Sequence, residues 1–167
     1  MIEEPKHFAE LCRQVGFVVL QAQLVEHNLA LYIATSMRLE QKEAVDIVQK
    51  ALDSSNRKTI ERLLQDVQKR FPIGPGLAKR IWDVKEERNW LVHRLQREAP
   101  SAVFSEEAAE PVFKRIQVLA REILAALQQL DGVGDRLVDT HGFDSSAIQA
   151  KAMDTIKEKT ANRVAGD

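Results

Sequence analysis

The sequence has little of the residues that build disulfide frameworks and tight turns. Cys12 is the only cysteine in 167 residues, so the chain can form neither an internal disulfide nor a thiolate metal cluster, and we expect Cys12 to be a small, half-buried apolar residue. Seven glycines and five prolines leave few positions for tight turns. This scarcity argues against an all-β fold.

Long apolar runs and an excess of charge of one sign are also missing. No stretch approaches the ~18 consecutive apolar residues of a membrane span, and residues 1–6 are too acidic for a signal peptide. We therefore expect a cytoplasmic protein without a membrane partner. The net charge of −1 lacks the basic excess that usually accompanies duplex binding through phosphates, so nucleic-acid binding would need a local site.

The apolar residues that are present, 44% of the chain, are enough for one domain with a core. From Phe8 to Ile33 they recur at spacings of three and four, which predicts a long amphipathic helix. Leu20, Leu24 and Leu31 widen its apolar stripe, as is typical of a helix that contacts neighbours on two sides. One of these neighbours is a candidate partner subunit.

The middle of the chain predicts two more helices and a break. We expect a short helix over residues 42–53, and residues 53–56 then supply candidate amino-terminal caps for a third helix that reaches Phe71. Residues 71–76 contain two prolines and two glycines, and Pro75 suits the first turn of the helix that follows.

The second half of the chain predicts two long helices. The fourth helix is expected over residues 75–97, with Pro100 ending it, and Pro111 opens or kinks the fifth. We expect turns at Gly132 and Gly134.

These elements predict an all-α fold, an antiparallel bundle of four main helices plus short extra helices. We expect residues 1–140 to form the bundle and residues 141–167 to form a peripheral helix or a partly disordered tail.

Arg88 occupies a position in the fourth helix where the apolar repeat would place another apolar side chain. A guanidinium there is costly to bury unless it meets a carboxylate or an anionic ligand. Glu26, Glu87 and a phosphate are the candidate partners.

Asn89 and His93 lie on one face of the same helix, ~40° apart at about 100° per residue. Arg88 lies about 140° from His93, so these two converge only if the helix is irregular or if two chains share the site. Residues 79–97 hold six Lys or Arg residues against three Asp or Glu residues. This local positive charge, which includes Lys85 and Arg94, suits a phosphate-binding site.

The pattern Arg88-Asn89-x-x-x-His93 resembles the Arg-polar-x(3–5)-His motif of HEPN (higher eukaryotes and prokaryotes nucleotide-binding) domains. Gln21-x(4)-Glu26 in the long first helix is similar to their opening helix. HEPN domains are all-α dimers, and many are metal-independent ribonucleases. The resemblance implies a homodimer, RNA as a partner, and neither a metal nor a cofactor.

The resemblance also implies roles for individual residues. His93 would assist the attack of an RNA 2′-hydroxyl on the adjacent phosphate, Arg88 would stabilise the charged phosphate, and Asn89 would position it. Glu26 would support Arg88, and Lys85 and Arg94 would bind RNA phosphates. A toxin or defence role, with an antitoxin or another protein as partner, follows from the resemblance alone.

Three functions are compatible with the sequence. The first is a metal-independent endoribonuclease that cuts single-stranded RNA at a dimer cleft. The second is a non-catalytic HEPN-like module that binds RNA, a nucleotide or a protein. The third is a helical oligomerisation protein, which the heptad-like run from Phe8 to Tyr32 indicates. The same Arg-x(4)-His spacing recurs in Arg136 and His141, without a polar residue after the arginine.

Overall fold

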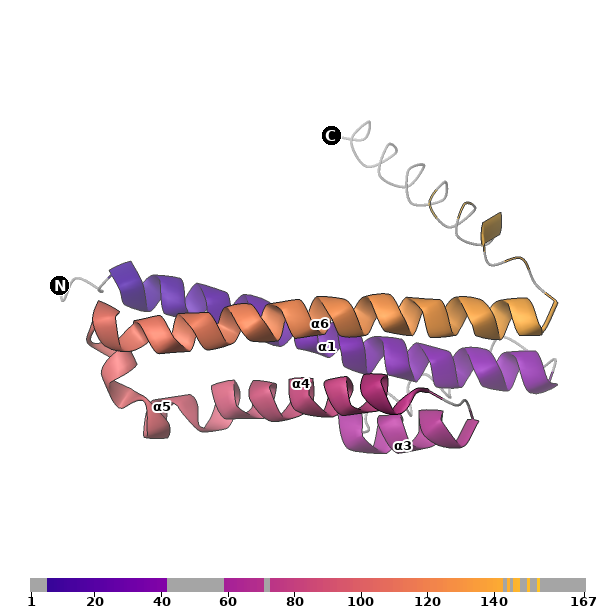
Figure 1. The fold of residues 1–167 in the computed structure, drawn as a ribbon, viewed down its shortest axis with the longest axis horizontal. Coiled ribbons are helices and arrows are strands. Elements are labelled where there is room, and N and C mark those ends of the chain that lie inside the picture. Colours follow the sequence, from indigo (N-terminus) through magenta and orange to yellow (C-terminus); the bar gives the residue numbers. More distant parts are fainter. Residues whose placement is uncertain are drawn as a thin grey trace, which may run out of the picture. The chain divides into compact units, whose positions relative to one another are not determined.

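All regular structure in the described residues is helical. The computed structural model describes residues 6–41, 59–70, 73–142 and a few positions between 144 and 153. It contains four long helices, α1 (Lys6–Gln41), α3 (Ile60–Arg70), α4 (Pro75–His93) and α6 (Glu106–Thr140) (Figure 1). Two short elements, α5 (Leu95–Glu98) and the 3₁₀ helix η1 (Pro100–Val103), connect α4 to α6. The predicted all-α bundle of four main helices plus short extra helices is confirmed.

Some predicted elements lie outside the described residues. They are the helix over residues 42–53, the candidate caps at 53–56, the end of the third helix at Phe71, and most of the segment 141–167. Contacts divide the chain into two compact units, Met1–Asp131 and Gly132–Asp167. The boundary between these units lies within α6, which ends at Thr140, and the predicted domain boundary after residue 140 stays a prediction. None of the helices in the described part of the chain combines the length and apolar character needed to cross a membrane.

Within the first unit, α4 runs antiparallel to α1. Arg88, near the end of α4, is paired with Glu26 in the middle of α1. Further along the chain, the carbonyl oxygen of Val103 in η1 lies 3.1 Å from His7 Nε2 at the start of α1. The chain therefore moves back along α1 as it passes from α4 through α5 to η1.

The first part of α6 is antiparallel to α4. Arg115 of α6 binds Glu87, and Glu122, two turns later in α6, binds Arg80, two turns earlier in α4. Because the two pairs run in opposite directions along the two helices, α4 and α6 form a helical hairpin through α5 and η1. This hairpin and α1 hold the candidate site residues of α4 in place.

The core of the first unit is formed by the apolar series that define the helices. The buried side chains include Leu11, Val18, Val25 and Leu29 of α1, Leu63 and Val67 of α3, Ile81 and Val84 of α4, and Ile116, Leu119, Ile123 and Leu130 of α6. Phe8 and Val15 are only partly buried. Cys12 is exposed, so the half-buried position expected for it is wrong.

The fourth helix is shorter than predicted. α4 ends at His93, and Arg94 takes a non-helical conformation (φ −120°, ψ −20°) before α5 begins. The backbone N–H of Arg94 still donates to the carbonyl of Trp90 at 2.9 Å, so the chain turns there without losing that bond. Pro75 is in the first turn of α4, as predicted.

The fifth predicted helix, α6, has Pro111 inside it and extends further at its carboxyl end than predicted. It begins before Pro111, because Ser105 Oγ accepts a hydrogen bond from the backbone N–H of Ala108 at 3.3 Å and caps the first turn. The turns expected at Gly132 and Gly134 are wrong, because α6 continues through both to Thr140. A helical glycine costs only about 1 kcal/mol relative to alanine. The burial of neighbouring apolar side chains such as Val133 outweighs a cost of that size.

Candidate functional site

The guanidinium of Arg88 joins α4 to α1 at the centre of the candidate site. Its Nη2 donates a hydrogen bond to Glu26 Oε1, and its Nη1 donates to Asn89 Oδ1 at 3.0 Å. The side chains of Arg88 and Glu26 are 24% and 26% exposed. Of the candidate partners for Arg88, Glu26 is therefore the one that the structure provides. A guanidinium has five N–H donors, so these two bonds leave it capacity for an anion.

His93 does not join this cluster. It is the last residue of α4, its side chain is exposed, and no hydrogen bond or ion pair to it occurs within the described part of the chain. The break in the helix lies at Arg94, beyond both Arg88 and His93, so it does not bring the two together. The structure thus brings Arg88, Asn89 and Glu26 together and leaves His93 open to solvent.

A hydrogen bond across the helix break joins the end of α4, near His93, to α5. The indole Nε1 of Trp90 donates to Glu98 Oε2 of α5 at 2.6 Å. This bond holds the pKa of Glu98 below its ordinary value, with Arg97 and Arg94 contributing in the same direction. The negative charge of Glu98 therefore helps to hold α5 against the end of α4.

The two predicted phosphate-binding cations differ in how freely they could reach a ligand. Lys85 Nζ lies 3.2 Å from Glu86, 3.7 Å from Glu61 and 4.0 Å from the centroid of the Trp82 ring, and its side chain is only 17% exposed. Arg94 lies at the distance limit of an ion pair, 4.0 Å from Glu86, and its side chain is 41% exposed. Arg94 is thus the more accessible cation beside His93.

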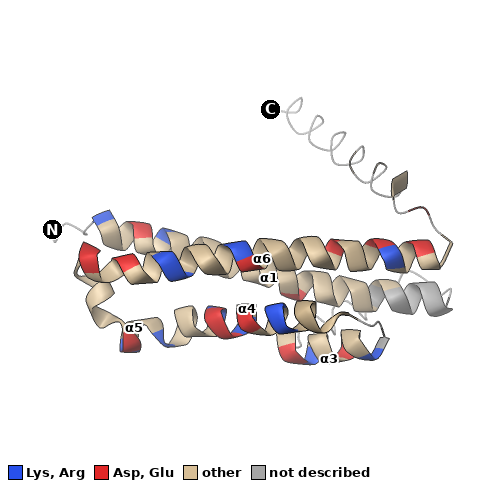
Figure 2. Cartoon of the chain, in the orientation of Figure 1, with Lys and Arg blue, Asp and Glu red and all other residues tan. Residues whose placement is uncertain are grey.

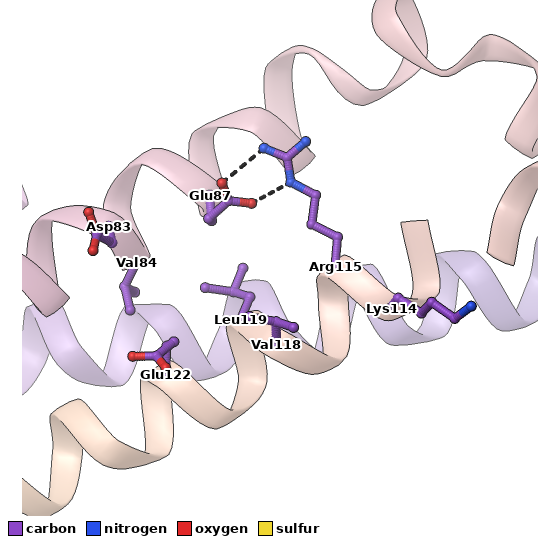
Figure 3. A pocket seen from close by; sticks show the side chains of 8 residues that line it. All are labelled: Asp83, Val84, Glu87, Lys114, Arg115, Val118, Leu119 and Glu122. Carbon is purple, nitrogen blue, oxygen red and sulfur yellow. Dashed lines mark hydrogen bonds and ion pairs between the residues drawn. The ribbon is translucent and has the colours of Figure 1, made fainter. Parts of the chain in front are cut away.

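A second charged cluster, on the α4–α6 hairpin, was not predicted. Arg115 binds Glu87 with two hydrogen bonds of 2.5 and 2.9 Å, and its guanidinium carbon lies 3.6 Å from the centroid of the Trp90 ring. Both side chains line a cavity of about 320 Å³ with an apolar floor that includes Val84 and Leu119 (Figure 3). Glu87, the alternative partner for Arg88, therefore pairs with Arg115 of α6 instead.

Short-range sequence patterns contain no signal for this cluster. Arg115 and Glu87 are 28 residues apart, and each sits beside an apolar series as a surface charge commonly does. Trp90 could be assigned to the core from its place in an amphipathic helix, and it is buried, with 7% of its surface exposed.

Comparisons of the chain with models of known protein families, with curated proteins and with solved structures give no match. Among the described residues, no group of three or more His, Cys, Asp or Glu side chains could hold a metal ion. The functional interpretation therefore rests on the geometry of the site residues described above.

Proposed function

We propose that this protein is a HEPN-type endoribonuclease that cleaves single-stranded RNA without a metal ion, using Arg88, Asn89 and His93. The observation that carries the proposal is that Arg88 is both held in place and partly exposed. Its guanidinium is oriented from two sides, by Glu26 of α1 and by Asn89, yet about a quarter of its side chain remains exposed. A fixed, partly desolvated cation of this kind suits the charge that develops on a phosphoryl group.

The proposed chemistry needs one cation and one general base. His93 takes the proton of the RNA 2′-hydroxyl, the O2′–P bond forms, and the P–O5′ bond breaks. The leaving 5′-oxygen takes a proton from water and becomes a hydroxyl group, and the other product ends in a 2′,3′-cyclic phosphate. Arg88 stabilises the negative charge on the phosphoryl oxygens, and Arg94 binds a neighbouring RNA phosphate.

The proposal includes a second subunit. Arg88 and His93 point in different directions on one helix, so His93 of one subunit would meet Arg88 of another at a shared cleft. Val92, which precedes His93 and is 48% exposed, offers an apolar contact for such a cleft.

The test is RNA cleavage in EDTA by folded wild-type protein and by His93→Ala and Arg88→Ala. We expect both substitutions to lower the rate at least about 100-fold, and the wild-type products to carry cyclic phosphate ends. His141→Ala is the matched control, because His141 is an exposed histidine at the end of a helix with the same spacing from an arginine. Equal cleavage by all four proteins would contradict the proposal.

One observation favours a second candidate, a non-catalytic HEPN-like module that binds RNA, a nucleotide or a protein. The charge of Arg88 is already balanced by Glu26, and a buried ion pair can serve to fix the packing of two helices. In that case the wild-type protein does not cleave RNA, while Arg88→Ala lowers stability.

A further inference from the structure

The outer face of α1 carries a row of exposed apolar side chains. Phe17, Leu20, Leu24 and Leu31 are 60%, 63%, 52% and 37% exposed. At about 100° per residue all four lie within ~60° of one another around the helix, on the side opposite the buried series of α1. Contiguous apolar patches of this kind on a soluble chain usually mark an interaction surface.

Three of these side chains are spaced symmetrically about Leu24, whereas Leu20 would lie opposite Asn28 of the other chain. Phe17 precedes Leu24 by seven residues and Leu31 follows it by seven, which is two turns of helix in each direction. If a second α1 lies antiparallel, with a twofold axis at Leu24, then Leu24 meets its own copy and Phe17 meets Leu31 of the other chain. This self-complementarity is what an isologous contact between identical subunits requires.

Charge also favours a second copy over other partners. Between residues 14 and 35, Glu26 is the only Lys, Arg, Asp or Glu, and it faces α4, where it pairs with Arg88. Figure 2 shows the corresponding tan stretch of α1 after its charged amino-terminal turns. A face without charge does not repel its own copy, and it offers no ion pair to an acidic or a basic partner.

We propose that this face of α1 is a twofold, antiparallel contact between two copies of the chain. The contact lies apart from the Arg88 site, because Glu26 and Leu24 lie about 160° apart around α1. It is therefore a different interface from the cleft that the proposed ribonuclease would share, and it does not depend on that function.

The first test is the mass of the assembly by analytical ultracentrifugation of the full chain. Leu24→Glu places two like charges at the twofold axis, and we expect it to halve the mass of the wild-type assembly. The matched control is Leu124→Glu, because Leu124 of α6 has nearly the same exposed fraction, 51%. Circular dichroism establishes that both variants remain folded. A monomeric wild-type chain at about 100 µM, or an unchanged mass in Leu24→Glu, overturns the proposal.

The second test is the direction of the two helices. In a Cys12→Ser background, chains with Phe17→Cys and chains with Leu31→Cys are mixed and mildly oxidised. We expect mixed disulfides between the two kinds of chain in clear excess over disulfides within either kind. An excess of Phe17→Cys homodimers would mean that the helices are parallel and would overturn the antiparallel contact.

RNA cleavage separates this proposal from the proposed function. Leu24→Glu does not touch the Arg88 site, so we expect an active enzyme to retain its cleavage per folded subunit. If the wild-type protein proves inactive, the mass and disulfide measurements still decide the α1 contact.

Discussion

Arg88 of α4 and Glu26 of α1, 62 residues apart in the chain, form an ion pair between two packed helices. This ion pair has two consequences for the guanidinium of Arg88. It stabilises the contact between α1 and α4, and it occupies part of the cation that the proposed reaction needs for phosphate. Removing the charge of Glu26 is therefore expected to lower the free energy of unfolding and to raise the affinity for RNA.

The ion pair should make the two residues energetically dependent on each other. Because both side chains are about three-quarters buried, we expect Arg88→Gln and Glu26→Gln each to lower the free energy of unfolding by about 1–3 kcal/mol. The double variant should lose clearly less than the sum of the two. Urea unfolding followed by circular dichroism measures all four proteins. Additive losses would show that the pair contributes nothing of its own.

Removing the competing carboxylate should strengthen RNA binding. In a His93→Ala background, which suppresses the proposed cleavage, we expect Glu26→Gln to lower the Kd for single-stranded RNA several-fold, or about 1 kcal/mol. Fluorescence anisotropy at constant salt measures this affinity, because salt alone alters it.

The control for that experiment is Glu110→Gln. Glu110 is an exposed residue of α6, 3.2 Å from Lys114, and its substitution changes the net charge by the same amount at another place. A similar gain in affinity for both variants would point to overall charge instead of release of Arg88. An unchanged affinity for Glu26→Gln would leave Arg88 with a structural role.

The bond between Trp90 and Glu98 should make the end of α4 sensitive to acid. The hydrogen bond from Trp90 lowers the pKa of Glu98 in the folded protein, so its stabilising contribution is present above the ordinary carboxyl pKa of 4.5 and is lost as pH falls through the lowered value. We expect the difference in melting temperature between wild type and Glu98→Gln to shrink steadily from about pH 5 downward.

Tryptophan fluorescence gives a second, local measurement of the same bond. With Trp82→Phe as background, Trp90 is the only tryptophan that remains. Its emission should change in acid while Glu98 is present and should stay constant over the same range in Glu98→Gln. A pH-dependent emission that persists in Glu98→Gln would assign the change to another group.

Hydrophobic periodicity predicted the four main described helices and one long-range contact, but not the ends of α4 and α6. Arg88 interrupts the apolar series of α4, and Glu26 lies beside the apolar stripe of α1, so the sequence indicated Glu26 as a candidate partner for Arg88. Periodicity could not locate the break at Arg94, across which Trp90 of α4 donates a hydrogen bond to Glu98 of α5. Periodicity could not identify the partner of Arg115 either, since the pairing with Glu87 depends on how α6 lies against α4.

The glycines near the end of α6 illustrate the same limit and allow a sharp comparison. Gly132 lies inside the helix, where an added Cβ would meet only Arg136 Nη1 at 3.7 Å, an ordinary contact. Gly142 follows the helix with φ +80°, a conformation that strains other residues. We expect Gly132→Ala to stabilise α6 by about 0.5–1 kcal/mol and Gly142→Ala to destabilise its end by about 1 kcal/mol. Thermal unfolding followed by circular dichroism measures both, and a loss of stability in Gly132→Ala would mean that the backbone at residue 132 departs from a regular helix.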